Sequence, residues 1–312
     1  VPSTVAARGQ RPAAATIAVF GDLPYSDAQI AGFDRLAASV NADPDVSLAL
    51  HLGDIKSGST PCTDARLQLV RDAFDRFDDP LVYTPGDNEW TDCHRTNNGS
   101  FLPTERLAKL RTLFFPQPGR TLGAHPARVE TQAAERRFRT YVENVRWEQG
   151  DVVFATLDVP GSNNDLVPWG APWNTDPFKA EQAAEVAGRT RAVVAWIRQA
   201  FEEAREEHAR AVVLAMQADM WDQTITTADI TGFVPIVQEI ATQSRRFRRP
   251  VLLLNGDSHT YEVDHPLADP GTAFNTVYGV TAPVPNLTRL TVQGSTVTPS
   301  GWVRLTIDPE TA

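Results

Sequence analysis

Short runs of hydrophobic residues alternate, in the first part of the chain, with segments whose hydrophobic positions recur at helical spacing. Three mostly apolar runs of strand length lie at 16–20, 46–52 and 81–84. Such runs are typical of strands buried on both faces. Between them, 26–40 and 63–77 have the spacing of amphipathic helices, and Ser26 and Thr63 stand where a helix cap is expected. The pattern predicts a β-α-β-α-β unit with parallel strands and right-handed crossovers.

Beyond Trp90 the alternation loosens and then resumes. The further expected elements are a helix at 104–115, a hairpin of 141–147 with 152–157, a helix from about 177 to about 208, buried strands at 211–216 and 251–254, and antiparallel strands at 290–292 and 303–307. No internal repeat or linker is visible in the sequence. We therefore expect one α/β domain over 17–312, preceded at 1–16 by a flexible N-terminal remnant.

The charge balance limits the partners of this chain. Aspartate and glutamate number 39 against 29 lysines and arginines, so the net charge is −10. An acidic chain repels nucleic-acid polymers and anionic membranes. No apolar run approaches the roughly 18 residues that suggest a membrane-spanning helix. We expect a small-molecule substrate, no nucleic-acid polymer and no membrane span, and the oligomeric state stays open.

Four of the strand-like runs end in the dipeptide Gly-Asp. The four carboxylates belong to Asp22, Asp54, Asp87 and Asp257. Because parallel strands end at one edge of a sheet, we expect these carboxylates to lie close together. Neighbouring carboxylates raise each other's pKa unless a cation lies between them, and a divalent metal ion is the simplest such cation. A single aspartate after a strand is usually a cap or turn residue, but four are not easily explained in that way.

The order of these motifs resembles that of the calcineurin-like metallophosphoesterase family, which includes purple acid phosphatases and many phosphodiesterases. The family carries Asp-x-His, Gly-Asp, Gly-Asn-His-Asp/Glu, a lone His and Gly-His-x-His, each after a strand. The matching stretches are Gly21-Asp22-Leu23-Pro24, Gly53-Asp54, Gly86-Asp87-Asn88-Glu89, Met216-Gln217 and Gly256-Asp257-Ser258-His259. The resemblance covers about 17–260 and implies a four-layer αββα sandwich of two mixed sheets flanked by helices.

The resemblance also implies a set of metal ligands. The positions carried over are Asp22, Asp54, Asp87, Gln217, Asp257 and His259. Asp22, Asp54 and His259 would hold one ion. Asp54 would bridge to a second ion, which Asp87, Gln217 and Asp257 would hold. Family histidines are replaced at Pro24, Asn88, Gln217 and Asp257, and the family asparagine is Asp87. Because this set is rich in oxygen, we expect one or two divalent ions, with Mn²⁺, Mg²⁺ or Ca²⁺ favoured over Zn²⁺ or iron.

The family's catalytic histidine corresponds to Asn88, which can donate a hydrogen bond but cannot transfer a proton. His94, in the same loop, is the nearest candidate acid, and Arg95 and Lys56 are candidates to hold phosphate oxygens. Each of these three is explained equally well as a surface loop residue. Tyr25 is a further candidate, for a phenolate ligand of the purple acid phosphatase type, although the tyrosine of those enzymes follows the second aspartate motif.

The two cysteines of the chain follow two of the aspartate motifs. Cys62 comes after Gly53-Asp54 and Cys93 after Gly86-Asp87, so in this topology both lie at the same sheet edge and a disulfide is open to them. The alternative is two free thiols in a cytosolic protein. A disulfide would imply an oxidising compartment. The chain also starts at Val1 with an Ala- and Pro-rich stretch, so we expect a secreted or periplasmic protein.

Together these features predict an enzyme that hydrolyses a phosphate monoester or diester by means of a metal-activated water. The alternative is a non-catalytic protein of the same fold that binds a metal ion or phosphate. The family histidines missing at Pro24 and Asn88 motivate this alternative.

Overall fold

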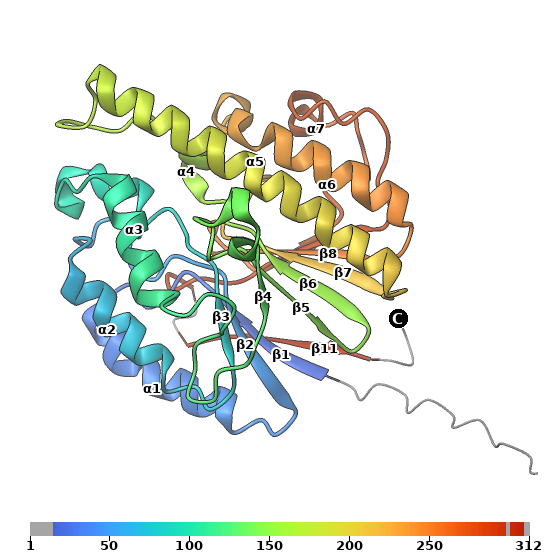
Figure 1. Ribbon diagram of the computed structural model, residues 1–312, viewed down its shortest axis with the longest axis horizontal. Coiled ribbons are helices and arrows are strands. Elements are labelled where there is room, and N and C mark those ends of the chain that lie inside the picture. Colours follow the sequence, from blue (N-terminus) through green and yellow to red (C-terminus); the bar gives the residue numbers. More distant parts are fainter. Residues whose placement is uncertain (1–14, 298–299, 309–312) are drawn as a thin grey trace, which may run out of the picture.

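The computed structural model describes residues 15–297 and 300–308, and it contains two β-sheets with helices on their outer faces (Figure 1). This is the predicted α/β arrangement of two mixed sheets flanked by helices. The expected remnant at 1–16 lies outside the described residues, except that Ala15 and Thr16 already belong to the first strand.

The first sheet has four strands in the order β11-β1-β2-β3. They are β1 (Ala15–Phe20), β2 (Val46–His51), β3 (Leu81–Tyr83) and β11 (Val303–Ile307). β1, β2 and β3 are parallel and β11 is antiparallel to β1, as predicted. Its outer face is covered by α1 (Asp27–Asn41), α2 (Asp64–Phe74) and α3 (Pro103–Phe114). The side chains of Ser26 and Thr63 cap α1 and α2, so both predicted helix starts are confirmed.

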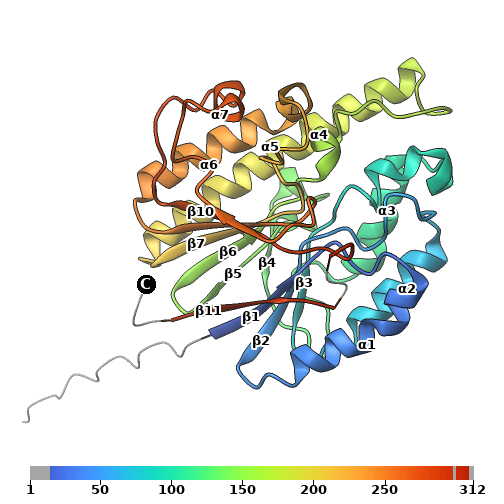
Figure 2. The same cartoon turned by 180° about the vertical axis from the view of Figure 1, so that it is seen from behind.

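The second sheet has seven strands in the order β4-β5-β6-β7-β8-β10-β9. They are β4 (Glu130–Thr131), β5 (Val145–Gln149), β6 (Val152–Thr156), β7 (Ala211–Ala215), β8 (Val251–Asn255), β9 (Glu262–Asp264) and β10 (Leu287–Thr291). The outer layer holds α5 (Asp176–Glu206), α6 (Val234–Phe247) and α7 (Ala273–Val277), as both views show (Figures 1 and 2). Short 3-10 helices lie at Thr91–His94, Thr96–Asn98, Gln132–Ala134, Arg136–Phe138 and Thr227–Phe233.

Three apolar cores hold these layers together. One lies between α1, α2, α3 and the first sheet, and another lies between α5, α6 and the second sheet. The third packs the inner faces of the two sheets against each other, with side chains such as Val19, Leu50, Phe154 and Leu254. Because parallel strands of both sheets end on the same side of the molecule, residues that follow β1, β2, β3, β7 and β8 meet there.

Some expected elements differ from the structure. The predicted antiparallel strand at 290–292 is only partly so: β10 is antiparallel to β9 but parallel to β8, because apolar alternation reports which faces are buried and not which way a strand runs. α6 has no counterpart among the expected elements: it lacks a side-chain cap, although Pro235 stands in its first turn, where proline is common. α4 (Gly161–Asp165) was not predicted either, and it is a turn of left-handed helix.

Candidate metal centre

The predicted aspartates lie just beyond the strand ends. Asp22 follows β1, Asp54 follows β2, Asp87 follows β3 and Asp257 follows β8. The φ angles of Asp22, Asp54 and Asp257 are positive, at 54°, 58° and 74°. An aspartate tolerates this left-handed conformation better than most residues. At each of these positions the chain therefore turns sharply after the strand and directs the carboxylate to the sheet edge.

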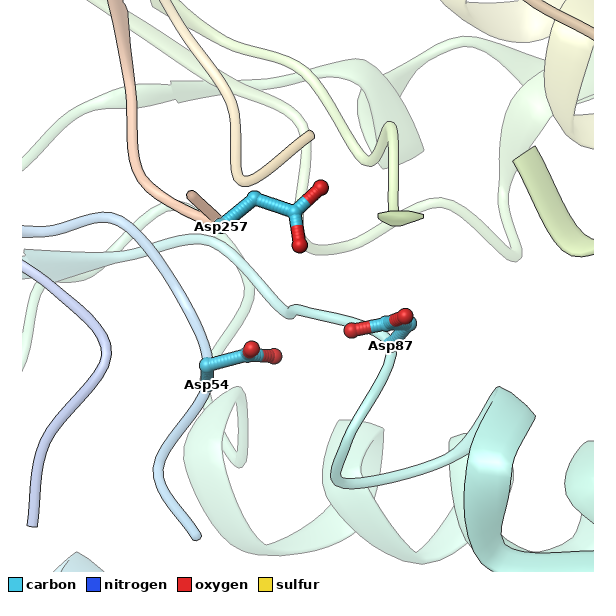
Figure 3. Close-up of side chains that lie close together, drawn as sticks. All are labelled: Asp54, Asp87 and Asp257. Carbon is cyan, nitrogen blue, oxygen red and sulfur yellow. The ribbon is translucent and has the colours of Figure 1, made fainter. Parts of the chain in front are cut away.

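Three of the carboxylates converge (Figure 3). Asp54, Asp87 and Asp257 each contribute one oxygen, and these oxygens all lie within 4.8 Å of one another. A Cβ atom on Gly161 would come within 2.8 Å of Asp87 Oδ2 and 3.0 Å of Asp257 Oδ2, so only glycine fits against this cluster. Burial, together with the charge of Asp87, raises the pKa of Asp54 and of Asp257. A cation between the three groups would remove this repulsion.

Asp22 lies beside the cluster and is fully buried. Its Oδ1 accepts a hydrogen bond of 3.0 Å from the backbone N–H of Asp257. Its Oδ2 has no hydrogen-bond partner among the described residues, and a Cβ on Gly256 would lie 2.4 Å from it. Burial raises the pKa of this carboxyl, and the charges of Asp87 and Glu89 raise it further. An unpaired buried carboxylate next to three others fits a hard divalent cation such as Mn²⁺, Mg²⁺ or Ca²⁺.

His259 and Asn88 meet around the hydroxyl of Tyr25. His259 Nε2 lies 2.9 Å from Tyr25 Oη and 3.8 Å from Asp22 Oδ1. Tyr25 donates a hydrogen bond of 3.2 Å to Asp54 Oδ2, and the Asn88 amide donates one of 2.7 Å to the same oxygen. Burial and the negative charge of Asp54 raise the pKa of Tyr25, which favours the neutral phenol. Asn88 thus lies at the cluster, next to Asp54.

Gln217 follows β7 and reaches the cluster with its amide nitrogen. Its Nε2 donates a hydrogen bond of 3.3 Å to Asp87 Oδ1, whereas its Oε1 accepts the backbone N–H of Gly161. In this orientation the amide positions Asp87 and Gly161. A role for Gln217 as an oxygen ligand stays a prediction.

His94 and Arg95 lie in the loop that follows Asp87. His94 Nδ1 accepts a hydrogen bond of 2.9 Å from the backbone N–H of Gly170, and burial lowers the pKa of the imidazole. A role for His94 as the acid stays a prediction. Arg95 forms an ion pair of 2.6 Å with Asp92 and stays 40% exposed, so part of the guanidinium remains open to an anion.

Glu89 and Ser162 support the cluster, although neither is among the predicted site residues. Glu89 is fully buried and accepts hydrogen bonds from the backbone N–H groups of Asp54 and Gly86, at 3.1 and 2.6 Å, so it ties two ligand loops together. Ser162 Oγ lies 2.8 Å from Asp87 Oδ2. Glu89 closes the motif Gly86-Asp87-Asn88-Glu89, so the sequence offers a signal for it, whereas no sequence signal points to Ser162.

Of the two alternatives for the cysteines, the structure has the disulfide. Cys62 and Cys93 are bonded with a Cα–Cα distance of 5.8 Å, and both are fully buried. Their sulfur atoms lie 3.6 and 3.7 Å from the backbone oxygen of Asn88. The bridge therefore connects the loops that carry Asp54 and Asp87. Across the described residues, no helix is both long enough and apolar enough to cross a membrane.

Comparison with protein-family models finds no match. Comparison with curated proteins finds none either. Among solved structures, the chain is similar to GAP50, the anchor in the inner membrane complex of Plasmodium, with 8% identity, a TM-score of 0.44 and coverage of 90% of this chain and 71% of that one. It is also similar to the purple acid phosphatase PPD1 from yellow lupin (Lupinus luteus) seeds, with 12% identity, a TM-score of 0.49 and coverage of 91% and 44%. Likenesses this distant carry no information about activity.

Proposed function

We propose that the protein is a metal-dependent phosphoric ester hydrolase of the calcineurin-like metallophosphoesterase type. The observation that carries the proposal is the convergence of Asp54, Asp87 and Asp257 from three separate strand ends. Two of these strands belong to the first sheet and one to the second, so the cluster depends on the whole fold.

The residues at the site have distinct proposed roles. Asp54, Asp87 and Asp257 would hold a divalent ion, with the unpaired oxygen of Asp22 beside them. Such an ion supplies an activated water for attack on phosphorus and neutralises charge on the phosphoryl oxygens. The Asn88 amide donates to Asp54 Oδ2 and orients this proposed ligand, and the exposed part of Arg95 can pair with the phosphate.

The proposed substrate is a small phosphate monoester or diester. The net charge of −10 opposes binding of a nucleic-acid polymer. The buried disulfide supports a location outside the cytosol, in keeping with the expected secreted or periplasmic protein.

The test is hydrolysis of aryl phosphate monoesters and diesters by metal-depleted protein refilled with Mn²⁺, Mg²⁺ or Ca²⁺. We expect activity that depends on the added ion and that falls at least about a hundredfold in Asp54→Asn, because a ligand of the ion is lost. Asp176→Asn is the matched control, since this aspartate is 97% exposed at the start of α5. Absence of hydrolysis with every ion and ester would refute the proposal.

One observation favours a second candidate function. The group at the family's catalytic position is the amide of Asn88, and the imidazole of His94 is held by Gly170. A protein that binds a metal ion or phosphate without turnover would show tight ion binding that Asp54→Asn abolishes, and no hydrolysis of any ester.

A further inference from the structure

The hydroxyl of Tyr25 lies between the two halves of the expected ligand set. We propose that this hydroxyl takes the place of one of the two metal ions that the motif pattern implies, so that the protein binds a single divalent ion at Asp54, Asp87 and Asp257. The inference rests on the proposed function, because it assumes that these carboxylates bind a divalent ion.

The first step is the hydrogen bonding of the hydroxyl. Tyr25 Oη lies 3.2 Å from Asp54 Oδ2, 2.9 Å from His259 Nε2 and 3.3 Å from Asn88 Nδ2. With an ion bound, the Asp54 carboxylate can only accept, and the amide nitrogen can only donate. The hydroxyl therefore donates to Asp54 and accepts from Asn88, and its oxygen occupies the space between the carboxylate and the imidazole.

The second step is the imidazole of His259. Its Nδ1 lies 2.7 Å from Thr296 Oγ1, and its ring packs edge-on against the Tyr25 ring at 5.2 Å. If the threonine hydroxyl donates to Nδ1, the proton of the neutral ring is on Nε2 and points to the Tyr25 oxygen. In this arrangement both ring nitrogens are satisfied without an ion.

The third step is the contrast between the two ligand sets. Two ligand atoms of the same ion can be no farther apart than about twice the metal–oxygen distance. That distance is about 2.0–2.6 Å for Mg²⁺ and Ca²⁺. The carboxylates of Asp54, Asp87 and Asp257 meet this condition. In the part of the chain that the structure describes, no other group of three His, Cys, Asp or Glu side chains lies as close together. Asp22, Asp54 and His259 do not converge to the same extent.

The fourth step concerns what removal of the hydroxyl would leave. Asp22 Oδ1 is 3.8 Å from His259 Nε2, and Asp22 Oδ2 has no partner among the described residues. The hydroxyl keeps the imidazole apart from Asp54 Oδ2, and without it these groups could close around an ion together with that oxygen. Tyr25→Phe keeps the ring and removes only the oxygen, so this variant should gain a second ion.

The experiment counts the Mn²⁺ ions bound per chain by elemental analysis after gel filtration. Titration calorimetry measures the affinity of each bound ion. We expect one ion in the wild-type protein, two in Tyr25→Phe, and one again in the double variant Tyr25→Phe/His259→Ala, which lacks a ligand atom at position 259. The electron paramagnetic resonance spectrum gives a second readout, because neighbouring Mn²⁺ ions couple and an isolated ion does not. Tyr141→Phe is the matched control, since this half-buried tyrosine packs against Arg111 and should still bind one ion.

The outcomes separate this inference from the proposed function. Two ions in the wild-type protein would overturn the inference and leave the proposed function standing, and this result needs no variant to fold. One ion in both the wild-type protein and a folded Tyr25→Phe variant would also overturn it. No ion in any form of the protein would contradict the metal site itself.

Discussion

At the scale of single residues, Ser162 connects two acidic side chains. Its hydroxyl lies 2.8 Å from Asp87 Oδ2 and 3.0 Å from Asp92 Oδ1, and Asp92 pairs with Arg95 through its other oxygen. Burial and the charge of Asp87 raise the pKa of Asp92 to about 7. The chain of contacts from Arg95 to Asp87 therefore links a group that is suited to hold phosphate with a group that is suited to hold a metal ion.

Removal of the Ser162 hydroxyl should weaken metal binding. We expect about a tenfold loss of Mn²⁺ affinity in Ser162→Ala, because groups that orient metal ligands typically contribute a factor of 10–100. Ser162→Gly is the matched variant: it also lacks the hydroxyl, but glycine relieves the left-handed φ of 50° at this position. Calorimetry should give the same loss for both variants, and normal affinity in the glycine variant would show that only the backbone matters.

The place of the aspartates at the site could be predicted from the local sequence, whereas that of Ser162 could not. Asp22, Asp54 and Asp257 follow strand-like runs and a glycine, so their place at a sheet edge could be predicted from a few neighbouring residues. Ser162 lies in a Gly-Ser-Asn-Asn stretch that suggests only a turn. Its contact with Asp87 depends on packing between segments 75 positions apart, which no local pattern encodes.

At the scale of elements, α4 shows how tertiary contacts override local preference. Ser162, Asn163 and Asn164 have left-handed φ angles of 50°, 56° and 57°. Each such residue costs roughly 1–2 kcal/mol relative to a right-handed helix. The buried Arg189 donates to both the side chain and the backbone oxygen of Asn164, and the N–H of Gly232 donates to Asn163 Oδ1 at 2.7 Å. These contacts from distant elements fix the turn, so it could not be predicted.

The disulfide gives a prediction about the loops that carry the ligands. Cys62 and Cys93 are separated by 31 positions, and the chain-entropy relation for a loop of this length gives about 3–4 kcal/mol of stabilisation. We expect Cys62→Ala/Cys93→Ala to lose about this free energy of unfolding in guanidinium titrations. Its Mn²⁺ affinity should also fall, because both sulfur atoms contact the Asn88 backbone that holds Asp54. Unchanged stability and affinity would show that hydrogen bonds alone fix these loops.

At the scale of the whole molecule, the cluster forms where the two sheets meet. Asp54 and Asp87 come from the first sheet and Asp257 from the second, and an apolar core holds the sheets together. Sequence periodicity could predict the parallel strands, and hence that the aspartates share one side of the molecule, whereas the two sheets are implied only by the family resemblance. It could not predict which three carboxylates converge, because the separation of the sheets depends on side-chain packing between them.

Metal binding should stabilise the whole fold in a pH-dependent way. Burial raises the pKa of Asp22, Asp54 and Asp257, so the metal-free folded protein retains protons that the unfolded chain has lost above pH about 4. The stability that these groups contribute is present below this pH and is lost as the pH rises through their raised pKa values. A divalent ion competes with the same protons, so its affinity should increase over that range.

The stabilisation by the ion is therefore expected to be larger at pH 7 than at pH 5. An ion at a hundred times its dissociation constant adds about 2.7 kcal/mol to the free energy of unfolding. The measurement compares thermal unfolding with Mn²⁺ and with a chelator at each pH. The buried His51, with a pKa lowered to about 4, stays neutral at both pH values, so the difference between the two curves reports the carboxyl groups around the site, Asp92 included. If Mn²⁺ raises the unfolding temperature equally at both pH values, the ion does not bind to the carboxyl groups whose pKa is raised. In Asp54→Asn we expect Mn²⁺ to leave the unfolding temperature unchanged.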